Sequence, residues 1–191
     1  LMGTMATPLA PVVNFALGLK PTKAVLDGVM KIDHRRMFPK YAFGTFEGWY
    51  KKQASKQASF AKQVAYFHGC YVNYNNPQLG KDFVKAMNAV GVGVQLLEKE
   101  KCCGVALISN GFIDKAKKQG LSNIGAIRKA VVDKGIPVLA TSSTCTFTLR
   151  DEYPHLLDIN NEDVRDRIEV ATRYLYRLLS EGKVKFSFRT D

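Results

Sequence analysis

The chain has 191 residues, of which 46% are hydrophobic and 24% are charged. This length is sufficient for one domain with a sizeable core, and this composition excludes a disordered tail or a fibrous repeat. No stretch supplies the run of about 20 apolar residues that a membrane-spanning helix needs.

The formal net charge of +11 is distributed unevenly along the chain. Residues 1–19 contain no charged side chain, whereas residues 20–62 contain ten Lys and Arg against three Asp and Glu. An apolar segment followed by a basic one suits an anionic membrane surface or an acidic partner subunit. A solvated basic face beside a helix that packs on its own domain explains the same pattern. Charge alone leaves these interpretations open.

The first sixty residues are predicted to form a mostly helical, partly irregular extension. Its prolines are each expected to interrupt a helix nearby. Aromatic residues are dense between Phe38 and Tyr50, which is typical of a surface that docks against a domain. The polar stretch at residues 51–62 then predicts a boundary, with the extension at residues 1–60 and a second unit at residues 61–191.

From residue 63 the pattern alternates between strand and helix. Short apolar runs at residues 64–67, 92–96 and 136–140 predict strands. Apolar spacing predicts helices over residues 78–90, 111–134, 147–157 and 162–181, the second of them broken near Gly120. Asn161 is the expected N-cap of the last helix, and Gly182 its expected stop. This alternation predicts an α/β fold, in which a small parallel sheet carries crossover helices on its faces.

All four cysteines follow the predicted strands. Cys70 lies three residues after the first strand, Cys102 and Cys103 follow the second, and Cys145 lies five residues after the third. The carboxyl ends of parallel strands lie along one edge of a sheet, where ligands bind in such folds. The sequence therefore predicts that the four thiols converge on one site.

Four converging thiolates would suit an iron–sulfur cluster or a zinc ion. The sequence shows no signal-peptide pattern, so we expect a reducing, cytoplasmic compartment, where thiols serve metals or redox chemistry more often than structural disulfides. Two other interpretations stay open: the cysteines are small buried apolar residues, or Cys102 and Cys103 form a vicinal disulfide as a redox state. His68 is expected to bond to backbone or to orient a group at the site. Lys99 and Lys101 are expected to stabilise a negatively charged cluster.

A family resemblance rests on three motifs: His68-Gly69-Cys70, Cys102-Cys103-Gly104 and Ser142-Ser143-Thr144-Cys145. Together they resemble the cysteine-rich CCG domain. That family occurs in heterodisulfide reductase subunits, in glycolate and lactate oxidation iron–sulfur subunits, and in the C subunit of anaerobic glycerol-3-phosphate dehydrogenases. Residues 140–157 look most like the last of these branches, and the segment that contains Pro39-Lys40-Tyr41 and Trp49 is similar to its linker.

The resemblance also implies what surrounds the domain and what it binds. Such proteins usually carry an N-terminal ferredoxin-like module and a second CCG domain, so the chain looks like the linker plus the first CCG domain. The family motif ends in Cys-x-x-Cys and can supply five thiolates to a noncubane cluster. Here Ser142 replaces the first cysteine of that pair. The resemblance therefore favours four ligands to a 4Fe-4S cluster, namely Cys70, Cys102, Cys103 and Cys145.

The function implied by the resemblance is electron transfer within a respiratory dehydrogenase complex. The module, not itself catalytic, would relay electrons from a flavin-containing subunit that oxidises glycerol 3-phosphate. The electrons would pass towards quinone or a membrane-linked subunit. The expected location is cytoplasmic and peripheral, on the inner face of the cell membrane, with an anionic membrane surface as a candidate contact.

The alternative is a non-redox interaction domain, in which the same cysteines bind zinc and the basic, aromatic extension docks a partner subunit. Stoichiometric zinc without visible absorbance would identify it. Nucleic acid is not expected as a partner, because the basic segment matches no recognised nucleic-acid-binding motif.

Overall fold

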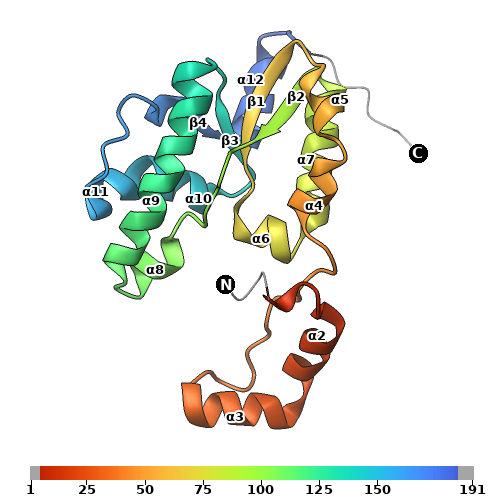
Figure 1. Cartoon of the computed structure of the whole chain (residues 1–191), viewed down its shortest axis with the longest axis vertical. Helices are drawn as coiled ribbons and strands as arrows, with labels where there is room; N and C mark the ends of the chain where they lie inside the picture. Colours follow the sequence, from red (N-terminus) through yellow and green to blue (C-terminus); the bar gives the residue numbers. More distant parts are fainter. Residues whose placement is uncertain (1–4, 185–191) are drawn as a thin grey trace.

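The computed structural model describes residues 5–184. Its body is built on a four-stranded, all-parallel sheet, and a smaller lobe of two helices lies beneath that body in Figure 1. The strands are β1 (Lys62–Phe67), β2 (Val92–Leu96), β3 (Val138–Ala140) and β4 (Ile168–Val170), in the order β2-β1-β3-β4. The predicted α/β fold with a small parallel sheet is confirmed.

The central strand β1 is buried on both faces. Val64 and Tyr66 belong to the apolar cluster on one face, and Ala65 and Phe67 belong to the cluster on the other. All four side chains are at most 1% exposed. A parallel strand that is apolar on both sides requires helices on both sides, and the rest of the chain supplies them.

Helices cover each face of the sheet (Figure 1). The face of Ala65 and Phe67 is covered by α9 (Ile113–Arg128) and α11 (Tyr153–Leu157), with α8 (Val105–Ser109) beside α9. The opposite face is covered by α4 (Phe46–Lys51), α7 (Pro77–Ala89) and α12 (Ala171–Ser180). The remaining short elements are α5 (Ala54–Ala58), α6 (Gly69–Tyr74), α10 (Ser143–Phe147), the π-helical turns Lys129–Asp133 and Thr148–Glu152, and the 3-10 turn Arg165–Arg167.

The helix predicted over residues 162–181 is wrong in its first half. A 3-10 turn and β4 occupy that half, and α12 begins only at Ala171, although it ends before Gly182 as predicted. Val164 and Ile168 are 0% exposed, so the apolar spacing identified buried residues but not their conformation. Pairing of β4 with the edge of β3 outweighs the helical pattern.

Asn161 is not a helix N-cap. Its Nδ2 atom donates to the carbonyl oxygens of Leu149 and Arg150 at 2.7 and 3.0 Å. Both carbonyls lie in the π-helical turn Thr148–Glu152. That turn lies between α10 and α11 without a gap, so the helical segment predicted over residues 147–157 is confirmed, with a π-helical turn inside it.

The break predicted near Gly120 is also wrong, because α9 runs without interruption from Ile113 to Arg128. A Cβ atom at Gly120 would lie 2.6 Å from Ile159 Cδ1 and 3.3 Å from Tyr153 Cζ. The glycine therefore allows neighbouring side chains to pack against the middle of the helix.

The lobe consists of α2 (Ala10–Gly18) and α3 (Lys20–Met30). Asn14 joins α2 to the linker that follows the lobe: its Nδ2 donates to the Tyr41 carbonyl oxygen, and its Oδ1 accepts from the Tyr41 N–H, both at 2.8 Å. The next residue, Ala42, donates its N–H to the carbonyl oxygen of Tyr74 at the end of α6, at 2.8 Å. The lobe is thus connected to the body through the linker and α6.

Two helices ahead of residue 60 pack on the sheet. In α4, Phe46 is 0% exposed, and the Tyr50 hydroxyl donates to the carbonyl oxygen of Val94 in β2. In α5, the side-chain oxygen of Gln57 accepts the Val94 N–H at 3.1 Å. Part of the segment predicted as an extension therefore contributes to the core, and the boundary near residue 60 stays a prediction.

Gly93 in β2 tests how closely α5 approaches the sheet. A Cβ atom there would lie 2.4 Å from the Gln57 carbonyl oxygen and 2.8 Å from Phe60 Cβ, so α5 must shift if a side chain is added. We expect Gly93→Ala to lower the free energy of unfolding by about 1–3 kcal/mol, as measured by urea denaturation.

The matched control is Gly125→Ala, because a Cβ at Gly125 in α9 would have nothing within 4 Å. Alanine favours a helix interior over glycine, so this substitution is expected to raise the free energy of unfolding by about 0.5–1 kcal/mol. A stabilising effect of both substitutions would contradict the close approach of α5 to β2.

Candidate metal centre

Three loops at the carboxyl edge of the sheet bring the four cysteines together. Cys70 lies in the first turn of α6 after β1, Cys102 and Cys103 lie between β2 and α8, and Cys145 lies in α10 after β3. These three strands are neighbours in the order β2-β1-β3, so the loops that follow them lie side by side. The structure shows the convergence, while the role of the cysteines as metal ligands stays a prediction.

The four sulfurs form a continuous chain of contacts in the order Cys70, Cys102, Cys103 and Cys145. The Sγ atoms of Cys70 and Cys102 lie 3.6 Å apart. Cys102 also contacts Cys103, and Cys103 contacts Cys145. All four are free cysteines. Cys103 is 2% exposed whereas Cys70 is exposed, so the set lies where the core meets solvent.

These contacts divide the thiols into hydrogen-bond donors and acceptors. Hydrogen bonds from Cys103 and Cys70 lower the pKa of Cys102, and a hydrogen bond from Cys103 lowers the pKa of Cys145 to about 7. The contact with Cys102 raises the pKa of Cys70 and of Cys103. These contacts favour the thiolate form at Cys102 and Cys145 over the thiol form, and the thiolate is the form that binds metal ions.

Backbone groups also reach the sulfurs. The N–H of Gly104 bonds to the sulfur of Cys102, and the N–H of Val105 bonds to the sulfur of Cys103, and each contact lowers the pKa of the thiol it reaches. Gly104 has φ +93°, in the left-handed region that strains residues with a side chain. The turn that presents these N–H groups therefore depends on glycine.

Ser142 has a structural role beside Cys145. Its Oγ atom accepts the N–H of Cys145 at 3.2 Å and caps the first turn of α10. This is the capping role that hydroxyl side chains typically have at helix starts.

A buried charged group lies behind the first cysteine loop. Glu100 accepts the N–H groups of His68 and Gly69 at 3.2 and 2.8 Å, which joins the loop after β2 to the loop after β1. His68 Nδ1 lies 2.9 Å from the Gly69 carbonyl oxygen. The ring also lies between two carboxylates, 3.3 Å from Glu47 and 3.4 Å from Glu100. His68 thus bonds to backbone, and it also bridges two acidic side chains.

Sequence reasoning missed three polar side chains that hold the loops: Glu100, Asn123 and Tyr153. Lys99 and Lys101, which were expected near the cluster, are both exposed, whereas the Glu100 side chain between them is only 3% exposed. Asn123 and Tyr153 are 0% exposed and bond to the backbone around Cys102 and Cys103. The available signal was the position of Asn123 on the buried stripe of its helix.

An open cleft of about 280 Å³ lies beside the sulfurs, lined by residues that include Cys70, Tyr71, Leu79 and Cys145. Over residues 5–184, no three His, Cys, Asp or Glu side chains already surround one point in the way that a single metal ion requires. The sulfurs contact one another instead. The donor set nevertheless suits soft metals and iron–sulfur clusters, for which thiolate is the matched ligand.

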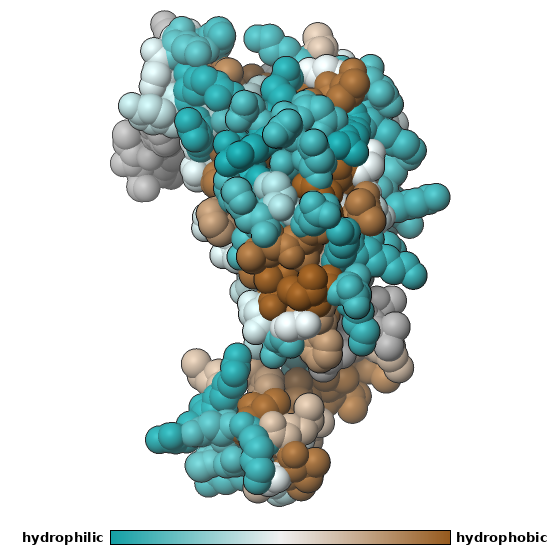
Figure 2. Space-filling view, turned by 90° about the vertical axis from the view of Figure 1, so that its left-hand side faces the viewer, coloured by the Kyte–Doolittle hydropathy of each residue, from teal (hydrophilic) through white to brown (hydrophobic). Residues whose placement is uncertain are grey.

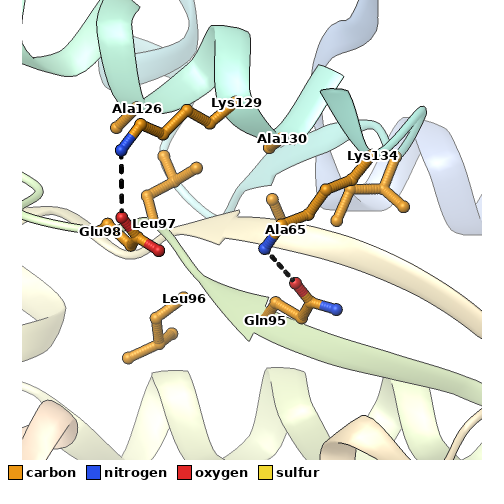
Figure 3. A pocket seen from close by; sticks show the side chains of 10 residues that line it. Ala65, Gln95, Leu96, Leu97, Glu98, Ala126, Lys129, Ala130 and Lys134 are labelled. Atoms are coloured by element: carbon orange, nitrogen blue, oxygen red, sulfur yellow. Dashed lines mark hydrogen bonds and ion pairs between the residues drawn. The ribbon is translucent and has the colours of Figure 1, made fainter. Parts of the chain in front are cut away.

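A second pocket lies between the end of β2 and α9 (Figure 3). Its volume of about 20 Å³ has room for about one water molecule, which excludes an organic substrate. Lys129 Nζ lies 3.3 Å from Glu98 Oε2, and Lys134 Nζ donates to Gln95 Oε1 at 3.1 Å. These contacts tie the end of β2 and the start of the loop that leads to Cys102 to the helical layer.

Comparison with known families identifies the class of domain. Residues 64–150 match the family of the cysteine-rich CCG domain. This range runs from β1 to the π-helical turn after α10 and includes every cysteine of the chain. Residues 64–150 are therefore a CCG cysteine-rich domain, as the three cysteine motifs predicted.

Individual relatives extend the similarity beyond this domain. The chain is 63% identical over 183 residues to the C subunit of the anaerobic glycerol-3-phosphate dehydrogenase of Escherichia coli K12, a match that covers 96% of this chain and 46% of that protein. It is 32% identical over 110 residues to an uncharacterised iron–sulfur protein of Methanocaldococcus jannaschii, which covers 58% of this chain and 21% of that protein.

A third relative is lactate utilization protein A of Bacillus velezensis, 32% identical over 94 residues, which are 49% of this chain and 37% of that protein. This chain thus spans about half the length, or less, of these relatives. No solved structure matches the chain.

The buried pair of Glu100 and His68 predicts that stability depends on pH. Burial raises the pKa of Glu100 from 4.5 to about 7. Burial lowers the pKa of His68, but Glu100 and Glu47 outweigh it and raise that pKa above 6.5. The folded chain therefore binds more protons than the unfolded chain, and stability must fall as pH rises. For Glu100 the fall spans pH 4.5 to about 7, and for His68 it begins at 6.5.

We expect the melting temperature of the metal-free protein to fall across this range, as measured by calorimetry. Glu100→Gln keeps a side-chain oxygen for one of the two loop N–H groups and removes the titratable carboxyl group, so it should flatten the acidic half of the profile. The control is Glu98→Gln, because the Glu98 side chain is 68% exposed. A profile that is equally steep in both variants would contradict the assignment to Glu100.

Proposed function

We propose that the four cysteines hold a 4Fe-4S cluster and that the domain is an electron-transfer module. The unbroken contact of four thiols at one sheet edge carries this proposal. The CCG domain and the relative named as an iron–sulfur protein support an iron–sulfur cluster as the cofactor. When bound, such a cluster accepts and releases single electrons.

The chain's own residues prepare the ligands. Cys102 and Cys145 are the sulfurs predisposed to be thiolates, and Cys70 and Cys103 each release a proton when they bind iron. Ser142 already caps α10 through the N–H of Cys145. It supplies no fifth thiolate, which favours a four-thiolate cluster over a five-thiolate one.

At the level of a complex, the module would relay electrons from a flavin-containing subunit that oxidises glycerol 3-phosphate towards quinone or a membrane-linked subunit. The identity of 63% to the C subunit of an anaerobic glycerol-3-phosphate dehydrogenase supports this placement. The surface around the centre suits a protein contact, because Cys70 is exposed and its neighbour Tyr71 is 53% exposed. Phe147, which lies two residues after Cys145 in α10, is 57% exposed.

A zinc-stabilised, non-redox interaction domain is the second candidate, because four cysteines in contact also make up the donor set of a structural zinc site. The two candidates differ in metal content and colour. Metal analysis of anaerobically prepared protein therefore decides between them.

The ligand assignment predicts a sharp dependence of iron content on the adjacent pair Cys102 and Cys103. We expect anaerobically reconstituted protein to bind iron and to give an EPR signal on reduction. Cys102→Ser and Cys103→Ser should each lower the iron content strongly, because a hydroxyl is a poorer match than a thiolate for this metal chemistry. Iron analysis and EPR are the measurements.

Ser142→Ala is the control variant. It removes a helix cap worth about 1 kcal/mol but leaves four thiolates, so the iron content should stay at the wild-type level. Stoichiometric zinc without visible absorbance would support the second candidate, and a protein that stays metal-free after reconstitution would contradict both.

We also propose that the lobe of α2 and α3 contacts an anionic membrane surface from the cytoplasmic side. Val12, Phe15 and Val29 are 65%, 71% and 78% exposed, and Figure 2 shows apolar side chains on the surface of the lobe. Each basic residue near such a surface contributes about 1 kcal/mol, and residues 20–36 contain five Lys and Arg. Within residues 5–184, no helix combines the length and the apolar character needed to cross a membrane.

Acidic substitutions on this apolar surface test the lipid contact. We expect the protein to sediment with anionic liposomes at low salt, and the double variant Val12→Asp, Phe15→Asp to lose this binding because buried apolar area and charge attraction both fall. The control is Leu156→Asp on α11, where Leu156 is 50% exposed on the body. An intact chain that ignores such liposomes would instead assign the lobe to a protein interface.

A further inference from the structure

The turn that carries Cys102 and Cys103 is held from inside the protein by Asn123 in α9. The Asn123 Oδ1 atom accepts the N–H of Lys101 at 2.8 Å. Its Nδ2 atom donates to the carbonyl oxygen of Cys102 at 3.2 Å and to the hydroxyl of Tyr153 at 3.0 Å. Asn123 is 0% exposed, and these bonds use the full capacity of its amide nitrogen.

Tyr153 holds the next peptide unit of the same turn. Its hydroxyl donates to the carbonyl oxygen of Cys103 at 2.9 Å, and its ring belongs to the apolar cluster under α9. The carbonyl groups of Cys102 and Cys103 are therefore both directed into the core, each by a side chain that is 0% exposed.

The geometry of the peptide bond transfers this orientation to the other side of the turn. In a trans peptide unit the C=O and the N–H point in opposite directions. The carbonyl of Cys103 shares its unit with the N–H of Gly104. Because Tyr153 draws that carbonyl inward, the Gly104 N–H faces outward, where it bonds to the sulfur of Cys102.

The next peptide unit, between Gly104 and Val105, is held in the same way by the start of α8. The Gly104 carbonyl oxygen accepts the N–H groups of Leu107 and Ile108 at 2.8 and 3.0 Å, at the start of α8. The N–H of Val105, in the same peptide unit, bonds to the sulfur of Cys103. Two N–H groups are thus aimed at two adjacent sulfurs, one by α8 and the other by Tyr153 and Asn123.

We propose that Tyr153, itself held by Asn123, is a positioning residue that sets the reduction potential of the centre by directing the Gly104 N–H at the sulfur of Cys102. This inference rests on the proposed iron–sulfur function. Hydrogen bonds to ligand sulfurs stabilise the added negative charge of the reduced cluster, and they are among the factors that set its potential. The Tyr153 hydroxyl is neutral and bonds to backbone and to Asn123 at this site, so its effect acts through orientation and not through charge.

Tyr153→Phe is the direct test, because it removes one hydroxyl and keeps the ring in the core. In the reconstituted protein we expect an unchanged iron content and a midpoint potential more negative than that of wild type, measured by an EPR-monitored redox titration. In the metal-free protein, Cys103 should react with a maleimide about tenfold faster, which corresponds to about 1.4 kcal/mol in the opening of the turn. Labelling at each cysteine is read by mass spectrometry.

Tyr50→Phe is the matched control. The Tyr50 hydroxyl is likewise a buried donor to a backbone carbonyl, that of Val94 in β2, but it lies in the other apolar cluster. It should cost similar stability and change neither the midpoint potential nor the labelling of Cys103. If Tyr153→Phe behaves in the same way as this control, Tyr153 is only structural and the proposal is wrong.

The redox titration and the maleimide labelling together separate this inference from the proposed function. A wild-type protein that takes up no iron would overturn the iron–sulfur assignment and, with it, the role of Tyr153 in setting a potential. Maleimide labelling of the metal-free protein would then still report whether Tyr153 positions the turn. Faster labelling of Cys103 without a shift in potential in an iron-loaded variant would limit Tyr153 to ordering the turn, and would equally contradict the proposal.

Discussion

The common direction of the strands is the constraint on which the centre depends. Because β1, β2 and β3 are parallel neighbours, their carboxyl ends share one edge, and Cys70 contacts Cys102 across 32 positions of sequence. Reversal of any one of these strands would carry its cysteine to the opposite edge. Parallel strands are stable only when both faces are covered. The packing of α4, α7 and α9 against the sheet is therefore a precondition for the gathering of the thiols, although none of these helices carries a cysteine.

Buried polar side chains fix the conformation of the loops that carry the cysteines. Glu100 joins the loops after β1 and β2, and Asn123 and Tyr153 hold the backbone on both sides of Cys102. Hydrogen bonds in a low-dielectric interior are strong when complete and costly when broken. These bonds order the loops in the folded protein, so little further ordering would be needed to bind the proposed metal.

The sheet and the meeting of the cysteines could be predicted, because apolar runs mark the ends of strands and the topology of parallel sheets determines where those ends lie. The strand β4 could not, because Ile168-Glu169-Val170 is three residues long and its identity depends on pairing with distant β3. The buried polar side chains that fix the loops also escaped prediction. The hydrogen bonds from Asn123 and Tyr153 to the cysteine turn span 21 and 50 positions of sequence. The spacing of apolar residues predicts which face of a helix is buried, but not which polar group a buried side chain will contact.

The short helix α6 joins two parts of the molecule that have been described separately. Its first turn carries Cys70, and its last residue, Tyr74, accepts the N–H of Ala42 from the linker of the lobe. A displacement of the lobe that moves α6 would therefore also move Cys70, the proposed ligand in the first turn of this six-residue helix. If binding of a partner or a membrane to the lobe shifts α6, it must change the affinity of the cysteines for the proposed cluster. Because linked equilibria are reciprocal, binding of the cluster must then change the affinity of the lobe by the same factor. In that case, attachment of the lobe and retention of the cofactor would be thermodynamically coupled.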